Sequence, residues 1–127
     1  MNWVNRIFRQ NESPKVTSVF PFFEFERAAH DLIEWSKAVS PSIYRVEWVT
    51  RNVDVPGTCI WVFCETLTGL DRWSITTRTV IQGQYLLLLR NKDVPDSWVD
   101  KMTFIFDSHE NVVRNYGGDY TARLFAR

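Results

Sequence analysis

The chain has 127 residues, the size of one ordinary domain, and nearly half of them are apolar, which excludes a disordered chain. Fifteen basic and fifteen acidic side chains cancel, so the general basic excess of a nucleic-acid-binding protein is missing. We therefore expect a single domain over residues 1–127 that has no nucleic-acid partner.

Residues 1–17 place Trp3, Val4, Ile7 and Phe8 in a spacing that indicates one or two helical turns with one apolar side. We expect an N-terminal helical extension packed on the domain, with binding to a membrane surface as the alternative. The segment has no apolar core of a signal peptide, and the apolar runs are far shorter than the ~20 residues that cross a membrane. These features predict a cytoplasmic protein without a membrane partner.

A helix is predicted from Pro21 to Ser40-Pro41. Pro suits the first turn of a helix, and a residue that precedes Pro disfavours its continuation. The apolar residues between these limits recur every three or four positions and form one stripe, which comprises Phe25, Ala28, Ala29, Leu32, Trp35 and Val39.

Strands are predicted from residue 43 onwards, where the period changes to two. Residues 44–49 alternate, and the continuously apolar run from Cys59 to Cys64 is typical of a central strand covered on both faces. In such a strand the two thiols face opposite sides, roughly 16 Å apart, which is too far for a disulfide and suits a reducing compartment.

The second half of the chain continues the expected series of strands. Thr68-Gly69 predicts a turn, residues 72–79 alternate, and residues 82–84 predict a hairpin that returns through residues 85–89. A short helix is expected at residues 95–98, then strands at 102–107 and 112–116 around a turn at 108–111. Gly117-Gly118 is expected to allow a turn with positive φ.

The predicted fold class is α+β, with one main helix packed on a curved, mostly antiparallel sheet of about five to six strands. An NTF2-like or cystatin-like sheet that wraps a helix has a similar outline. A pocket between helix and sheet in such a fold would hold a small molecule or an enzymatic site.

No pattern of catalytic or metal-binding residues is recognisable. His30 and His109 have no metal-ligand spacing, and the cysteines lie in an apolar run that does not suit a nucleophile. Glu47 and Glu65 are the candidate carboxylate pair for acid–base chemistry, although the alternation of the strand directs Glu47 to solvent. We therefore expect no cofactor, no metal and no enzymatic activity, and a protein that acts by binding.

The C-terminal part resembles the YezG-like immunity proteins. The resemblance rests on Val94-Pro95-Asp96-Ser97-Trp98, the apolar run from Met102 to Asp107, the run from Val112 to Tyr116, and Asp119-Tyr120. It implies a small cytoplasmic protein that binds and blocks a cognate bacterial toxin domain, often a basic nuclease. The expected oligomeric state is a monomer or a weak homodimer.

Acidic residues gather in the same region, and an acidic surface favours rapid docking of a basic partner. Acidic loops at 93–96 and 107–110 are therefore the candidate interface, with three aromatic anchors whose alternative place is the core. The candidate partner-binding residues are Asp93, Asp96, Trp98, Asp107, Glu110, Tyr116, Asp119 and Tyr120.

Overall fold

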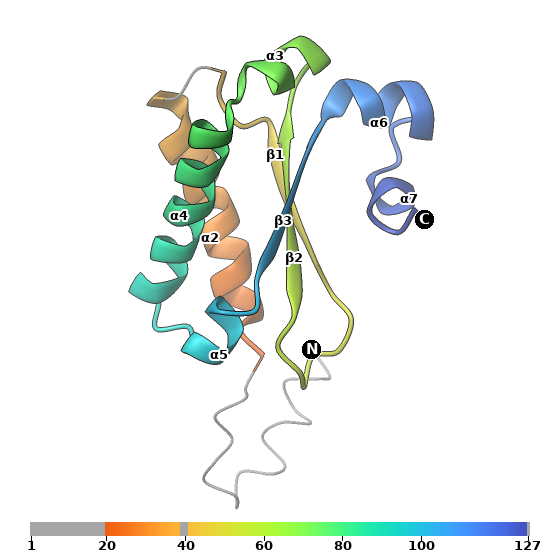
Figure 1. Ribbon diagram of the computed structural model, residues 1–127. Coiled ribbons are helices and arrows are strands. Elements are labelled where there is room, and N and C mark those ends of the chain that lie inside the picture. Colours follow the sequence, from red (N-terminus) through yellow and green to blue (C-terminus); the bar gives the residue numbers. More distant parts are fainter. Residues whose placement is uncertain (1–19, 39–40, 127) are drawn as a thin grey trace, which may run out of the picture.

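The computed structural model describes residues 20–38 and 41–126 (Figure 1). The expected N-terminal extension at residues 1–17 lies outside the described residues, as does the end of the predicted first helix at residues 39–40. The elements, in chain order, are α2 (Phe22–Trp35), a 3-10 turn (Ser36–Ala38), β1 (Arg45–Thr50), β2 (Thr58–Cys64), α3 (Leu67–Arg72), α4 (Ile75–Asn91), α5 (Asp96–Val99), β3 (Thr103–Ser108), α6 (His109–Tyr116) and α7 (Tyr120–Leu124).

The α+β class is confirmed, but the prediction of one main helix is wrong, because α4 is a second long helix, and the predicted sheet is wrong in size and direction. The described residues form three strands in the order β1-β2-β3 instead of five to six. β1 pairs with β2 antiparallel, and β2 pairs with β3 parallel, so the sheet is mixed rather than mostly antiparallel. The central position predicted for the apolar run at 59–64 is confirmed, because β2 has a neighbour on each side.

Helix α2 follows the prediction closely. Pro21 stands at its N-cap position without a side-chain hydrogen bond, and Phe25, Ala28, Ala29 and Leu32 are the buried residues of its apolar stripe. At the start of the 3-10 turn, the Ser36 hydroxyl donates to the Ile33 carbonyl and accepts from the Ile43 amide. This buried side chain therefore connects the end of the helix to the segment that leads into β1.

Helix α4 replaces the predicted strand at 72–79 and the hairpin that follows it. Ser74 accepts a hydrogen bond from the Thr77 amide and so caps the helix, while Ile81, Tyr85 and Leu89 are buried at four-residue intervals. Alternation of β-branched residues at the start of this segment resembled a strand. The helical pattern prevails because three large side chains, one per turn, bury themselves in the core.

Helix α6 likewise replaces the strand predicted at 112–116. Ser108 caps it by accepting from the Asn111 amide, and Gly117 ends it with φ 61°. The positive φ expected at Gly117-Gly118 is confirmed at both residues. The turn predicted at Thr68-Gly69 is instead part of helix α3, whereas the short helix expected near residues 95–98 is confirmed as α5.

Helices cover both faces of the sheet. Figure 1 shows α2 and α4 side by side against one face, called here the first face, and α6 and α7 on the opposite or second face. The main core lies under the first face and includes Val46, Ile60 and Val62. A smaller buried cluster lies on the second face and comprises Trp61, Phe63, Val112 and Tyr120.

Candidate functional site

The first of the two predicted acidic loops connects α4 to α5. Asp93 adopts φ 62°, the one non-glycine residue with positive φ among the described residues, and its amide donates to the Arg90 carbonyl. Left-handed backbone is uncommon for a residue with a side chain, although Asp tolerates it better than most. Asp96 follows in the first turn of α5. Trp98 is completely buried in the main core and therefore offers no surface contact.

Asp93 and Asp96 are exposed, and within residues 20–38 and 41–126 neither carboxylate has a hydrogen bond or an ion pair. Their basic neighbours are directed elsewhere, because Lys92 pairs with Asp31 at 2.8 Å and Arg90 lies 3.9 Å from Asp100. The loop therefore presents two free negative charges on a strained backbone.

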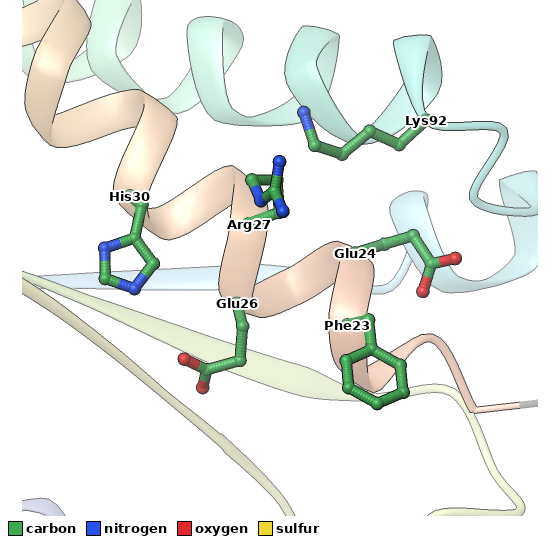
Figure 2. A pocket seen from close by; sticks show the side chains of 6 residues that line it. All are labelled: Phe23, Glu24, Glu26, Arg27, His30 and Lys92. Carbon is green, nitrogen blue, oxygen red and sulfur yellow. The ribbon is translucent and has the colours of Figure 1, made fainter.

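A shallow hollow of about 450 Å³ lies on the outer side of α2, next to the end of α4 (Figure 2). Its side chains come from Phe23, Glu24, Glu26, Arg27 and His30 of α2 and from Lys92, and in Figure 2 they do not converge on a common point. Glu26 is engaged, since it accepts a hydrogen bond from Trp48 Nε1 at 2.9 Å. The hollow has no arrangement of groups that would select a ligand.

The second sheet face is ordered by strand register into three rows. The first row is Arg45, Phe63 and Asp107, the second is Glu47, Trp61 and Ile105, and the third is Val49, Cys59 and Thr103. Side chains of α6 and α7 reach the first two rows: Tyr120 packs on Phe63 with ring centroids 4.9 Å apart, and Arg123 lies 4.8 Å from the Trp61 ring.

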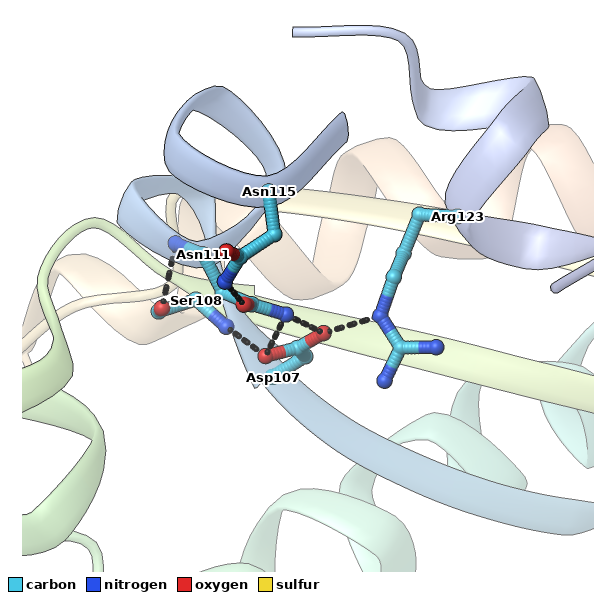
Figure 3. A network of polar contacts seen from close by, with 5 residues as sticks. All are labelled: Asp107, Ser108, Asn111, Asn115 and Arg123. Carbon is cyan, nitrogen blue, oxygen red and sulfur yellow. Dashed lines mark hydrogen bonds and ion pairs between the residues drawn. The ribbon is translucent and has the colours of Figure 1, made fainter. Parts of the chain in front are cut away.

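Asp107 connects three elements through its carboxylate (Figure 3). It accepts from the Ser108 amide at 2.8 Å, from Asn111 Nδ2 at 3.0 and 3.2 Å, and from Arg123 Nε at 2.6 Å. The side chains of Asp107 and Arg123 are only 9% and 23% exposed. The charge that was expected to face a partner is thus enclosed, and it holds α6 and α7 on the end of β3.

A second cluster on the same face surrounds Tyr120. Its hydroxyl lies 2.7 Å from His109 Nδ1, and the Arg45 guanidinium lies 3.8 Å from the centre of its ring. Burial raises the pKa of the Tyr120 hydroxyl to about 12, against a smaller opposite effect of the Arg45 charge. A phenol with a raised pKa keeps its proton at neutral pH, so this arrangement suits packing and hydrogen bonding better than proton abstraction.

The remaining predicted site residues also contact their own fold. Glu110 accepts from the Leu67 amide and pairs with Arg114 at 2.6 Å, and Asp119 caps α7 by accepting from the Ala122 amide. The ring of Tyr116 lies 5.4 Å from the Arg123 guanidinium. Residues 93–96 lie near one end of β3 and lead into α5, whereas residues 107–110 form the other end of β3 and the start of α6 (Figure 1). They do not form one surface.

The residues considered for catalysis are not brought together. Glu47 pairs with Arg45 at 2.6 Å on the second face, whereas Glu65 is exposed beyond the end of β2. Cys64 is buried in the main core and Cys59 belongs to the smaller cluster on the opposite face, and burial raises the pKa of both thiols. No group of three potential metal ligands occurs in the described part of the chain.

The pocket expected between helix and sheet is filled by side chains of the main core. Phe25, Leu32, Ile60, Val62 and Tyr85 are completely buried where α2 and α4 meet the first face. The Tyr85 hydroxyl also donates to the Phe25 carbonyl across this layer.

Several residues that shape the second face were missed at the level of sequence. Arg45 and Arg123 enclose Trp61 and Tyr120, and Asn111 binds Asp107. The alternation of β1 places Arg45 on the same face as Glu47, and a four-residue spacing relates Asp107 to Asn111. Arg123 had no comparable signal, because its role depends on where α7 packs.

No helix in residues 20–38 or 41–126 has both the length and the apolar character needed to span a membrane. Comparisons with models of protein families, with characterised proteins and with solved structures find no match to this chain.

Proposed function

We propose that the protein acts by capturing a basic partner protein, and that this capture provides immunity by blocking a bacterial toxin domain. The proposal combines the resemblance of residues 94–120 to YezG-like immunity proteins with the surface at the α4–α5 loop. Inhibition by occlusion requires no catalytic residue, so a fold whose polar clusters serve its own packing is compatible with it.

The observation that carries the proposal is the state of Asp93. Its backbone is left-handed at φ 62°, and its exposed carboxylate has no partner in the described part of the chain. Backbone strain of this kind costs on the order of 1 kcal/mol and is retained where the surrounding structure or a function requires it. Asp96 adds a second free charge beside it, so the loop offers a small acidic surface for a basic protein.

Of the eight predicted interface residues, we retain Asp93 and Asp96 as the proposed contact. Six of the eight candidates are buried or engaged with their own fold, whereas Asp93 and Asp96 remain exposed and free in the region described. The aromatic contacts of the interface would have to come from neighbours or from the partner. Phe23 of α2 is a candidate, since its side chain is largely exposed.

The test starts with the tagged protein as bait in its source cell and with mass spectrometry as readout. One tightly bound basic protein is expected, and co-expression should then rescue cells from its toxicity. The affinity for that partner should decrease at least tenfold in the double variant Asp93→Asn and Asp96→Asn. Asn keeps the tolerance for left-handed backbone while it removes the charge.

The matched control is Asp54→Asn with Asp71→Asn, which removes two exposed acidic charges elsewhere on the molecule. This control should bind the partner as the wild type does. A bait that retains no protein, or equal affinities of the two double variants, would refute capture through this loop.

A further inference from the structure

The third row of the second sheet face is left open by the helices that cover the other two. Val49, Cys59 and Thr103 lie side by side there in register, beyond the end of α7. A groove of about 650 Å³ occupies this place. Its volume falls within the range of roughly 300–1,000 Å³ that is typical of small-molecule sites.

The groove has an apolar floor and wall. Trp61 and Val49 line it from the sheet together with Ile105, and Leu124 and Phe125 close it from the C-terminal side. Ile105 and Phe125, which both line the groove, are 38% and 64% exposed, respectively. A bound apolar body would remove both from water.

Among the described residues that line the groove, two are cations and none is a carboxylate. Arg51 follows β1 and Lys101 precedes β3, and both are exposed lining residues. Within the residues described, neither side chain has an ion pair or a hydrogen bond. Two arginines on the same face differ from them, because Arg45 pairs with Glu47 and Arg123 pairs with Asp107, each at 2.6 Å. Two uncompensated positive charges beside an apolar hollow complement an anion attached to an apolar body.

We propose that this groove binds a small amphipathic anion, a carboxylate on an alkyl or aryl body. The apolar part lies against Trp61, Ile105 and Phe125, and the carboxylate lies between Arg51 and Lys101. This site does not depend on the proposed capture of a protein.

Decanoate is a suitable probe, with decyltrimethylammonium as a control of equal chain length and opposite charge. Calorimetric titration of the full chain should show saturable binding of decanoate and none of the cation. The place of binding can be read from Cys59, which lines the groove, whereas Cys64 is buried in the main core. Decanoate should slow the alkylation of Cys59 at least tenfold, and Cys64 should stay unmodified throughout.

The double variant Arg51→Gln and Lys101→Gln should bind decanoate at least tenfold more weakly. Its matched control, Arg27→Gln with Arg72→Gln, removes two exposed cations from α2 and α3 and should bind as the wild type does. Since all four residues are on the surface, the variants should keep the fold, which the unchanged protection of Cys64 verifies. Absence of saturable binding, protection by the cation, or equal affinity of the two double variants would overturn the proposal.

Discussion

Asp107 shows how one carboxylate can organise a whole side of the molecule. It accepts from a backbone amide, an asparagine and an arginine, and it is nearly inaccessible to solvent. Removing one member of an enclosed ion pair leaves the other charge without compensation, at a cost of about 3–5 kcal/mol.

The variant Asp107→Asn should therefore lower the free energy of unfolding by about 3 kcal/mol, because the single oxygen of the asparagine amide cannot accept from both the Ser108 amide and Arg123 Nε, which bond to different oxygens of Asp107. Urea denaturation measures the loss. The control Glu34→Gln breaks an ion pair with Lys37 whose side chains are 70% and 66% exposed, and it should cost under about 0.5 kcal/mol. Equal losses in the two variants would contradict the structural role of Asp107.

The burial of Asp107 could not be predicted from the sequence. Asp107 was expected to lie in an acidic loop that faces a partner, whereas its carboxylate is enclosed and pairs with Arg123. An acidic residue after an apolar strand looks like a surface loop. Only the packing of α7, which arises from the tertiary fold, distinguishes an enclosed carboxylate from a solvated one.

Tyr120 predicts a pH dependence of stability. Its pKa is raised by burial from 10 to about 12, so the unfolded chain releases the proton at lower pH than the folded chain does. The stability that this group contributes is complete below pH 10 and is lost as the pH rises from 10 to about 12.

In Tyr120→Phe, the free energy of unfolding should depend less steeply on pH across this interval than it does in the wild type. Denaturant titrations at several pH values on either side of the interval provide the comparison. Tyr116→Phe, which removes another tyrosine hydroxyl of the second face, is the control and should keep the steep dependence. If both variants retain the steep pH dependence, Tyr120 is not the group that causes it.

Helices α3 and α4 each contain a glycine, and the two positions have opposite surroundings. A Cβ on Gly83 in α4 would meet nothing within 4 Å, whereas a Cβ on Gly69 in α3 would lie 2.7 Å from Cys64 Sγ. Alanine favours a helix over glycine by about 1 kcal/mol when the site has room.

We therefore expect Gly83→Ala to raise the free energy of unfolding by roughly 0.5–1 kcal/mol. Gly69→Ala should lower it, because the buried sulfur of Cys64 has little freedom to move aside. Thermal denaturation of the two variants shows whether each one is more or less stable than the wild type, and each variant is the control for the other. A destabilised Gly83→Ala protein would mean that this side of α4 is not open.

The elements that were predicted correctly share a strong local pattern. α2 has a helical apolar stripe, and β2 is continuously apolar, which places it at the centre of the sheet. α4 and α6 were predicted as strands because β-branched residues dominate their apolar positions. The caps Ser74 and Ser108 were the better signal, since each accepts a hydrogen bond from the amide three residues later.

The two layers of the molecule differ in how much apolar surface secures them. The main core contains most of the buried residues, while the cluster on the second face rests on four buried side chains in the region described. Regions with few buried apolar contacts open at lower free energy than the main core does.

Amide hydrogen exchange should therefore show α6 and α7 opening before α2 and α4. In Asp107→Asn the difference in opening free energy between the two pairs of helices should increase, because the variant loosens the attachment of α7 and leaves the main core unchanged. Equal protection of the amides in both layers would mean that the second layer is an integral part of a single cooperative unit.

The parallel pairing of β2 with β3 has a consequence during synthesis of the chain. β3 emerges only after α3, α4 and α5, so the apolar β2 has one unpaired edge while those residues are being translated. Until β3 is translated, the unpaired edge of β2 can form backbone hydrogen bonds with a strand of another nascent chain on the same messenger RNA. Helix α4 of the connection packs beside α2 on the first face, so early docking of α4 would cover part of this sheet before β3 is translated.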